Sequence, residues 1–253
     1  MKRISDRLYI STIADNAGDI ARERGCGLEI AEFCTAFNMD IDFSKWDKQV
    51  RDKMKGIDFF AFHAAFNELC PAAVDPMIVG VAKRRYRQAY DLMAGYGISA
   101  MIAHSGFVPL LYDKGWFAAK SVQFWREFIS EKPDQFRLFI ENVLEDSPDI
   151  LLEIAGTIND DRLRLCLDIG HAAYMGKGIP VTEWAERMMP FLGHVHIHNN
   201  NGECDSHSAP GEGNADVAAV IRMVAEADPR VTYTIESSDG NRSVEWMEAN
   251  GFL

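Results

Sequence analysis

The sequence predicts an α/β protein whose strands form a closed barrel of eight parallel strands, with a helical connection after each strand. Eight short runs of β-like pattern recur along the 253 residues, and helix-period segments lie between them. Six successive runs end on a residue that can bind a metal. Parallel neighbours need crossovers that cover the outside of the sheet, and barrel active sites lie at the carboxyl ends of the strands. A doubly wound open sheet is the alternative architecture.

The strands are predicted from short apolar or alternating runs bounded by turn residues. In chain order they cover residues 7–12, 27–33, 58–64, 98–104, 136–142, 163–170, 194–199 and 232–237. The clearest helical periods cover residues 76–95, 116–132, 148–158, 181–189 and 214–227. No linker, repeat or low-complexity tract interrupts this alternation, so we expect one domain over residues 1–253.

The composition and net charge of the chain argue against some classes of binding partner. The chain is 47% hydrophobic and 25% charged, with a net charge of −12, so binding to a phosphate backbone would need a local basic patch. The dense basic run, Lys83 to Arg87, is expected on a solvated helix face, and a nucleic-acid partner is not expected. The five cysteines are scattered and form no CxxC pair, which favours a reducing compartment. The sequence shows no signal-peptide core and no long apolar run. We therefore expect a cytoplasmic protein without a membrane segment.

Potential metal ligands stand at the ends of the third to eighth strands. They are His63, His104, Glu141 followed by Asn142, Asp168 with His171 just after it, His196 to Asn199, and Glu236. Strands that converge on one barrel mouth bring such side chains together, and imidazole and carboxylate groups suit zinc or manganese. The sequence therefore predicts a divalent-metal centre at this mouth.

The seventh strand is rich in histidine. Alternation sends His194, His196 and His198 to one face, and Val195 and Ile197 to the other, under the helices. We expect His196 to be the main ligand and His194 to be structural. Two roles remain open for His198: it either supports a metal ligand or contacts the substrate.

Two further features lie near the predicted mouth. Asp205 and His207 follow the seventh strand in a loop rich in glycine and proline, which favours tight turns and a second set of ligands. Glu29 and Glu32, near the end of the second strand, either orient substrate or ligands or cap the surface.

With these residues assembled, the chain resembles the xylose isomerase-like TIM-barrel superfamily, which includes sugar isomerases and epimerases and the endonuclease IV branch. The resemblance implies a single (β/α)₈ TIM barrel. It is carried by "FHAAFN" (62–67), "AHSG" (103–106), "IEN" (140–142), "LDIGHA" (167–172), "HIHN" (196–199), "DSH" (205–207), "GEGN" (211–214) and "IES" (235–237).

Similarity to the tagatose 3-epimerase-like branch implies one divalent ion held by Glu141, Asp168, His196 and Glu236. It also implies that Glu141 and Glu236 are the catalytic pair that moves a proton between the two faces of a sugar. A metal-stabilised enediolate fits this chemistry. We expect His198, Asn142 and Asn199 to contact the substrate.

Similarity to the endonuclease IV branch implies a larger ligand set that holds three zinc ions. Its additional positions match His63, His104, His171, Asp205 and His207. The chain departs from that branch elsewhere, since "HAAFN" lacks the proline and tyrosine after the histidine, and Asn199 stands where an aspartate is usual.

The leading hypothesis is a metal-dependent isomerase or epimerase of a keto-sugar or sugar phosphate. The alternative is a multi-zinc phosphoesterase, either an abasic-site endonuclease or a hydrolase of small phosphoesters. A sugar-binding or metal-sensing protein without turnover is a third class. The expected cofactor is one to three Mn²⁺ or Zn²⁺ ions and the expected partner is a small carbohydrate. The oligomeric state stays open, a homo-oligomer included.

Overall fold

The computed structural model describes residues 3–253, and its strands close into a barrel. The strands are β1 (Leu8–Ser11), β2 (Gly27–Ile30), β3 (Phe60–His63), β4 (Ala100–His104), β5 (Arg137–Glu141), β6 (Leu163–Asp168), β7 (Leu192–Ile197) and β8 (Thr232–Ile235). Each pairs in parallel with its neighbours in chain order, and β1 pairs with β8. The predicted (β/α)₈ TIM barrel is confirmed, because this last pairing excludes the open sheet.

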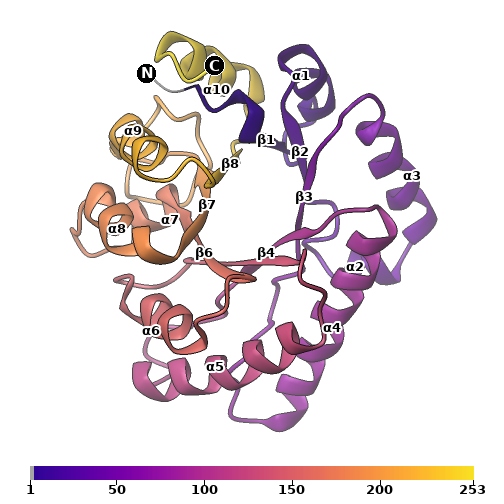
Figure 1. The fold of residues 1–253 in the computed structure, drawn as a ribbon, viewed down its shortest axis with the longest axis vertical. Coiled ribbons are helices and arrows are strands. Elements are labelled where there is room, and N and C mark those ends of the chain that lie inside the picture. Colours follow the sequence, from indigo (N-terminus) through magenta and orange to yellow (C-terminus); the bar gives the residue numbers. More distant parts are fainter. Residues whose placement is uncertain (1–2) are drawn as a thin grey trace.

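Helices surround the barrel (Figure 1). They are α1 (Ala17–Arg24), α2 (Phe37–Asp40), α3 (Phe43–Met54), α4 (Pro76–Gly95), α5 (Lys114–Ser130), α6 (Asp149–Ile158), α7 (Ile169–Met175), α8 (Val181–Met188), α9 (Val217–Ala227) and α10 (Gly240–Ala249). The five predicted segments correspond to α4, α5, α6, α8 and α9. Helix α3 is not among the predicted segments, because its charged sequence buries only Val50. Helix α7 is not among them either, since it is short and contains a glycine.

The seventh strand separates two environments. Val195 and Ile197 are fully buried in the main core between the strands and the helices, as predicted. His194 faces the barrel interior, where its ring stacks on Phe139 with centroids 5.4 Å apart. A small apolar cluster that includes Phe139 and Tyr9 also lies there. Apolar side chains therefore line the barrel around His194, and the polar side chains gather nearer the carboxyl ends of the strands.

Most strands end before the predicted residue; β2 ends at Ile30 rather than at residue 33, and β8 at Ile235 rather than at residue 237. Two other differences involve predicted site residues. The sixth strand was expected to reach residue 170, but β6 ends at Asp168, whose side chain accepts a hydrogen bond from His171 N at 2.7 Å and caps α7. The seventh strand was expected to reach residue 199, but β7 ends at Ile197. His171 is thus helical, and His198 lies just beyond the strand.

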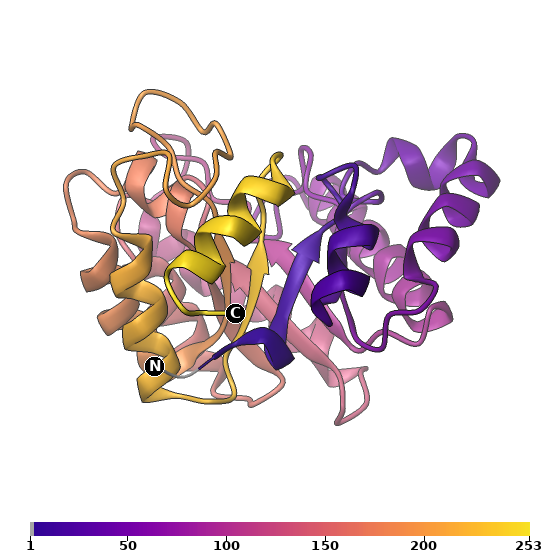
Figure 2. The same ribbon diagram turned by 90° about the horizontal axis from the view of Figure 1, so that it is seen from above.

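The segment between β7 and α9, coloured orange, rises above the carboxyl ends of the strands (Figure 2). Asn199 fastens its two ends, because its side-chain amide donates to Pro210 O (2.8 Å) and Ala215 O (3.1 Å). Gly213 packs against Asn199, and a Cβ on this glycine would lie 2.3 Å from Asn199 Oδ1. "GEGN" therefore contributes to the closure of this segment over the mouth.

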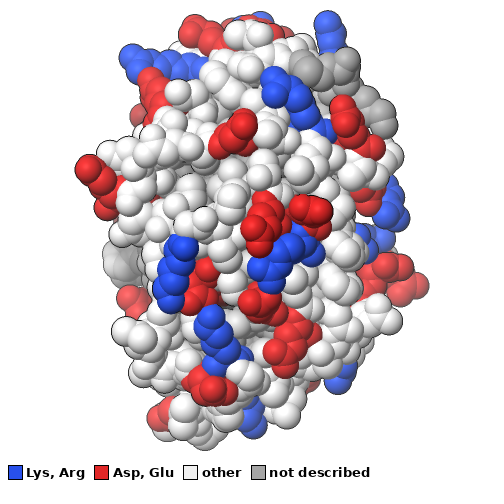
Figure 3. Space-filling model, turned by 90° about the vertical axis from the view of Figure 1, so that its left-hand side faces the viewer, with Lys and Arg blue, Asp and Glu red and all other residues white. Residues whose placement is uncertain are grey.

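Surface charges are largely paired. In the basic run on α4, Lys83 forms an ion pair with Glu127 (2.6 Å), and Arg85 forms one with Asp40 (2.6 Å). On the face drawn in Figure 3, acidic and basic side chains are interspersed. The basic run therefore behaves as a solvated helix face, as predicted. No helix within residues 3–253 is long and apolar enough to cross a membrane.

Candidate metal centre

The nine predicted ligands, together with His198, converge at the carboxyl ends of the strands and form three of the groups that could hold an ion. The first group is His63, His104 and Glu141; the middle group is Glu141, Asp168, His196 and Glu236; the third group is His171, His198, Asp205 and His207. Within each group, one potential ligand atom per residue lies within 4.8 Å of the others. The fold therefore brings together side chains that are up to 173 positions apart, from His63 to Glu236.

The middle group is built around His196. Its Nδ1 lies 3.0 Å from Glu236 Oε2, 3.4 Å from Glu141 Oε1 and 3.7 Å from Asp168 Oδ2. Burial opposes ionisation of Glu141, but His196 and His104 outweigh it and hold its pKa well below the ordinary range. Burial also disfavours the protonated form of His196, yet the neighbouring anionic groups raise its pKa well above the usual value. Without an ion, the protonated imidazole of His196 thus partly offsets the charge of the carboxylates.

The first group lies on the other side of Glu141. Glu141 Oε2 is 3.3 Å from His63 Nε2 and 3.5 Å from His104 Nε2, while Oε1 faces the middle group. Burial lowers the pKa of His104 to about 3 and keeps its imidazole neutral. One carboxylate therefore faces two candidate ion positions.

Several buried polar atoms in these groups have no hydrogen-bond partner within residues 3–253. They are both carboxylate oxygens of Glu141, Oε2 of Glu236, Nδ1 of His196 and Nδ1 of His198. Buried polar atoms are rarely left unsatisfied, and an ion is one of the explanations for such a group. The orphaned atoms all belong to the predicted ligand set or stand next to it, so the donor set fits divalent metal ions.

Glu29 lies beneath the middle group and is fully buried, which excludes the surface-capping alternative for it. Its Oε2 lies 3.2 Å from His196 Nε2 and accepts a 2.6 Å hydrogen bond from Thr234. His194 uses both ring nitrogens on the hydroxyls of Thr232 (2.7 Å) and Thr234 (2.9 Å). Glu29 is therefore placed to hold His196 with Nδ1 toward the other carboxylates.

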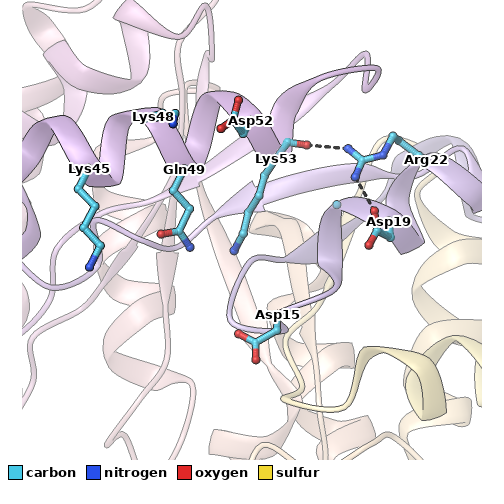
Figure 4. A pocket seen from close by; sticks show the side chains of 9 residues that line it. Asp15, Asp19, Arg22, Lys45, Lys48, Gln49, Asp52 and Lys53 are labelled. Atoms are coloured by element: carbon cyan, nitrogen blue, oxygen red, sulfur yellow. Dashed lines mark hydrogen bonds and ion pairs between the residues drawn. The ribbon is translucent and has the colours of Figure 1, made fainter.

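Glu32 has a different environment. Its carboxylate accepts a 2.6 Å hydrogen bond from Thr12 and lies 2.8 Å from Lys53 Nζ. Lys53 also lines a surface cavity between α1 and α3, which contains none of the predicted ligands (Figure 4). In that cavity Arg22 donates to Asp19 (2.7 Å) and to Lys53 O (3.1 Å). This cavity is separate from the metal centre.

The side-chain amide of Asn142 is hydrogen-bonded to the backbone of Asp168, at the end of the neighbouring strand β6. Its Nδ2 donates to Asp168 O (3.0 Å), and its Oδ1 accepts from Asp168 N (2.9 Å). Asn199 is similarly engaged with its own segment, and both side chains are buried. Their predicted contact with substrate stays a prediction, and the hydrogen bonds that they make here position Asp168 and the loop.

A family model described as xylose isomerase-like TIM barrel matches residues 14–253. The chain belongs to this family.

Three solved structures resemble the chain over nearly its whole length. A D-tagatose 3-epimerase-like protein has a TM-score of 0.77 at 22% identity, with 96% of this chain and 95% of that chain covered. A Thermus thermophilus protein soaked with zinc chloride has a TM-score of 0.75 at 20% identity, with 97% and 98% covered. D-allulose 3-epimerase from Methylomonas sp., in complex with D-allulose, has a TM-score of 0.68 at 17% identity, with 92% and 84% covered. At these identities the likeness establishes the fold.

Metal uptake by this barrel should release protons. Burial opposes protonation of His63 and His207, but Glu141 beside His63 and Asp205 beside His207 raise each pKa to about 9. Both imidazoles are therefore mostly protonated at pH 7.5 in the metal-free protein, and each must lose its proton to bind a metal. Metal affinity should rise with pH up to about 9. Titration calorimetry in buffers of different ionisation enthalpy measures the release, and a buffer-independent heat would contradict it.

Substitution of Glu29 by glutamine should weaken binding of one metal equivalent by roughly 10–100-fold, because the variant loses the buried charge that orients His196. A competing chelator titrated against the loaded protein measures the affinity. Glu32→Gln is the matched control, since Glu32 pairs with Lys53 and is not in the ligand groups. Equal affinities in the two variants would show that Glu29 does not support the ligand.

Proposed function

We propose that the protein is a divalent-metal-dependent isomerase or epimerase of a keto-sugar or sugar phosphate. The middle group carries this proposal. Glu141 from β5 and the residue just after β8, Glu236, bring two carboxylates to His196 Nδ1, with Asp168 beside them. Three carboxylates and one imidazole suit a six-coordinate ion such as Mn²⁺, which would keep positions for two substrate oxygens.

A bound divalent ion would polarise the carbonyl of the sugar and stabilise the negative charge that develops on its oxygens. Glu141 and Glu236 would divide the proton transfer between them. One carboxylate takes the proton from the carbon next to the carbonyl, and the other returns a proton to the enediolate. Asp168 and His196 hold the centre, Glu29 orients His196, and Asn142 fixes the backbone of Asp168.

The carboxylate pair lies in the buried part of the centre, below an edge that faces solvent. Glu141 and Asp168 are fully buried, whereas Asp205 and His207 keep about a third of their side chains exposed, at 33% and 29%. The solvent-facing edge of the centre therefore lies beside the β7–α9 segment. The similarity to a D-tagatose 3-epimerase-like protein and to D-allulose 3-epimerase supports a ketose as the substrate class.

Incubation with a panel of ketoses and their phosphates in deuterated water tests the proposal. With Mn²⁺, Co²⁺ or Zn²⁺ we expect deuterium at the carbon next to the carbonyl of at least one sugar. Comparison of each sugar with its phosphate identifies which form is the substrate. No exchange across the panel with any of the three metals would refute the proposed reaction.

A multi-zinc phosphoesterase is the second candidate, and the shared position of Glu141 favours it. The first and middle groups meet at this carboxylate, which allows two neighbouring ions of the kind that activate water and stabilise a leaving oxygen. Two or three metal equivalents together with cleavage of an abasic duplex or a chromogenic phosphodiester would support it. One equivalent without cleavage would exclude it.

A further inference from the structure

Glu145 is a buried acidic residue that the proposed reaction does not use. It lies in the connection between β5 and α6, four positions after Glu141. Its neighbour Asp146 forms ion pairs with Lys114 and Lys177 at the surface. Burial of Glu145 raises the pKa of its carboxyl group. A buried carboxyl group is costly unless hydrogen bonds satisfy it, so its partners indicate what it does.

Both oxygens of Glu145 accept hydrogen bonds from segments that flank Glu141. Oε2 accepts from Val143 N at 2.7 Å, and Oε1 accepts from the hydroxyl of Ser105. Ser105 directly follows β4, and its backbone N donates to Glu141 O at 3.1 Å. One side chain therefore holds the residue two positions after Glu141 and also the strand end that pairs with Glu141.

Ser105 is itself held in place. Its side chain is buried, and Oγ accepts a hydrogen bond from Phe107 N at 3.1 Å while it donates to Glu145. The next residue, Gly106, has a φ of 75°, and a Cβ at this position would lie 2.7 Å from Leu69 O. The turn after β4 is therefore tightly packed, and Ser105 gives Glu145 a fixed anchor.

The carboxylate of Glu141 depends on its backbone for its direction. Neither of its oxygens has a hydrogen-bond partner within residues 3–253, and the two oxygens face imidazoles of the first and middle groups. On the β6 side, Asn142 fixes the chain through its two hydrogen bonds to the backbone of Asp168. Glu145 supplies the corresponding restraint on the β4 side, through Ser105.

We propose that Glu145 is a positioning residue, which together with Ser105 holds the backbone of Glu141 in the geometry that metal binding needs. It acts through hydrogen bonds, because it belongs to none of the ligand groups within residues 3–253. The first and middle groups share Glu141, so a shift of its backbone would disturb both. The inference rests on the proposed function only in that Glu141 must bind an ion.

Variants of the full-length protein test this role by their affinity for Mn²⁺ and Zn²⁺, measured with a competing chelator. Glu145→Leu keeps the approximate size of the side chain but has no acceptor, so the tightest equivalent should bind roughly 10–100-fold more weakly. Ser105→Ala should weaken binding by a smaller factor, and it carries the test if Glu145→Leu does not fold. Glu145→Gln can accept from Val143 N and donate to the Ser105 hydroxyl, so it should lose less than about tenfold.

Two controls separate positioning from a general loss of stability. Asp146→Asn removes the surface ion pairs of the same connection and should leave the affinity at the wild-type value. Ile154→Ala removes core contacts of the buried Ile154 in α6, so it should lower the Tm without a change in affinity. All affinities are measured well below the Tm of each variant. The combined Ser105→Ala and Glu145→Leu variant should bind metal no more weakly than Glu145→Leu, because either change breaks the same connection.

The outcomes that contradict the proposal are specific. It is wrong if Ser105→Ala and Glu145→Leu bind metal as tightly as Ile154→Ala, or if Glu145→Gln is as weak as Glu145→Leu. Fully additive losses in the combined variant would also overturn it. Affinity is measured without sugar, so a wild-type protein that binds metal but exchanges no deuterium refutes only the proposed function. A wild-type protein that binds no divalent ion would overturn both.

Discussion

Substitution of Glu236 by glutamine should lower the rate of solvent deuterium exchange into the substrate by about a thousandfold or more, which corresponds to about 4 kcal/mol. Glutamine preserves the size of the side chain and one oxygen donor, but it cannot accept the carbon-bound proton as a carboxylate does. The measurement is kcat for exchange at saturating Mn²⁺ and ketose.

Metal content must be measured in the same preparation, because Glu236 also lies in the middle group. A variant that retains its metal and loses exchange places the defect in proton transfer. Glu203→Gln is the control, since Glu203 is an exposed glutamate on the β7–α9 segment. Wild-type exchange by a metal-loaded Glu236→Gln protein would rule out Glu236 as one of the proton-transferring pair.

Removal of the metal should destabilise the fold substantially. Glu141, Asp168 and His196 are fully buried, so the stripped protein must hold their charges in the interior without the ion. At free metal a hundredfold above Kd, each occupied site stabilises the folded state by about 2.7 kcal/mol. For a chain of this size that corresponds to a fall in Tm of roughly 5–10 °C for each site emptied.

Calorimetry of chelated and reloaded samples checks this expectation. The Tm should recover on addition of Zn²⁺ or Mn²⁺ after the chelator is removed, and Ca²⁺ should restore less because it prefers an all-oxygen ligand set. An unchanged Tm in a sample whose metal loss is verified by elemental analysis would mean that the groups do not bind ions in the folded protein.

The barrel could be predicted because its strands have a local signature. Val195 and Ile197 alternate with His194 and His196, and this period of two survives in the folded strand. Helix α3 does carry apolar residues at helical spacing, with Trp46, Val50 and Met54 on the side that faces the core. Most of its other residues are charged and only Val50 is buried, so this short stripe is easily overlooked in the sequence.

The convergence of strand ends could also be predicted, but the partners of individual side chains could not. Glu29 is separated from His196 by 167 positions, and its burial follows from the closure of the barrel between β1 and β8. The pattern around Glu29 allowed either a surface cap or an orienting role. Similarly, the space for His198 depends on Gly170, at a point where β6 passes directly into α7.

The position of Glu141 between two ligand groups makes their occupancies interdependent. Ions in the first and middle groups would both be bound by the carboxylate of Glu141, so each would receive less of its negative charge. The two cations would also repel each other across this carboxylate. The resulting coupling is reciprocal: whichever ion binds first lowers the affinity for the second by the same factor. The two ion positions should therefore be occupied in order of affinity as the metal concentration rises. Protein produced at low metal concentration should contain only the more tightly bound ion.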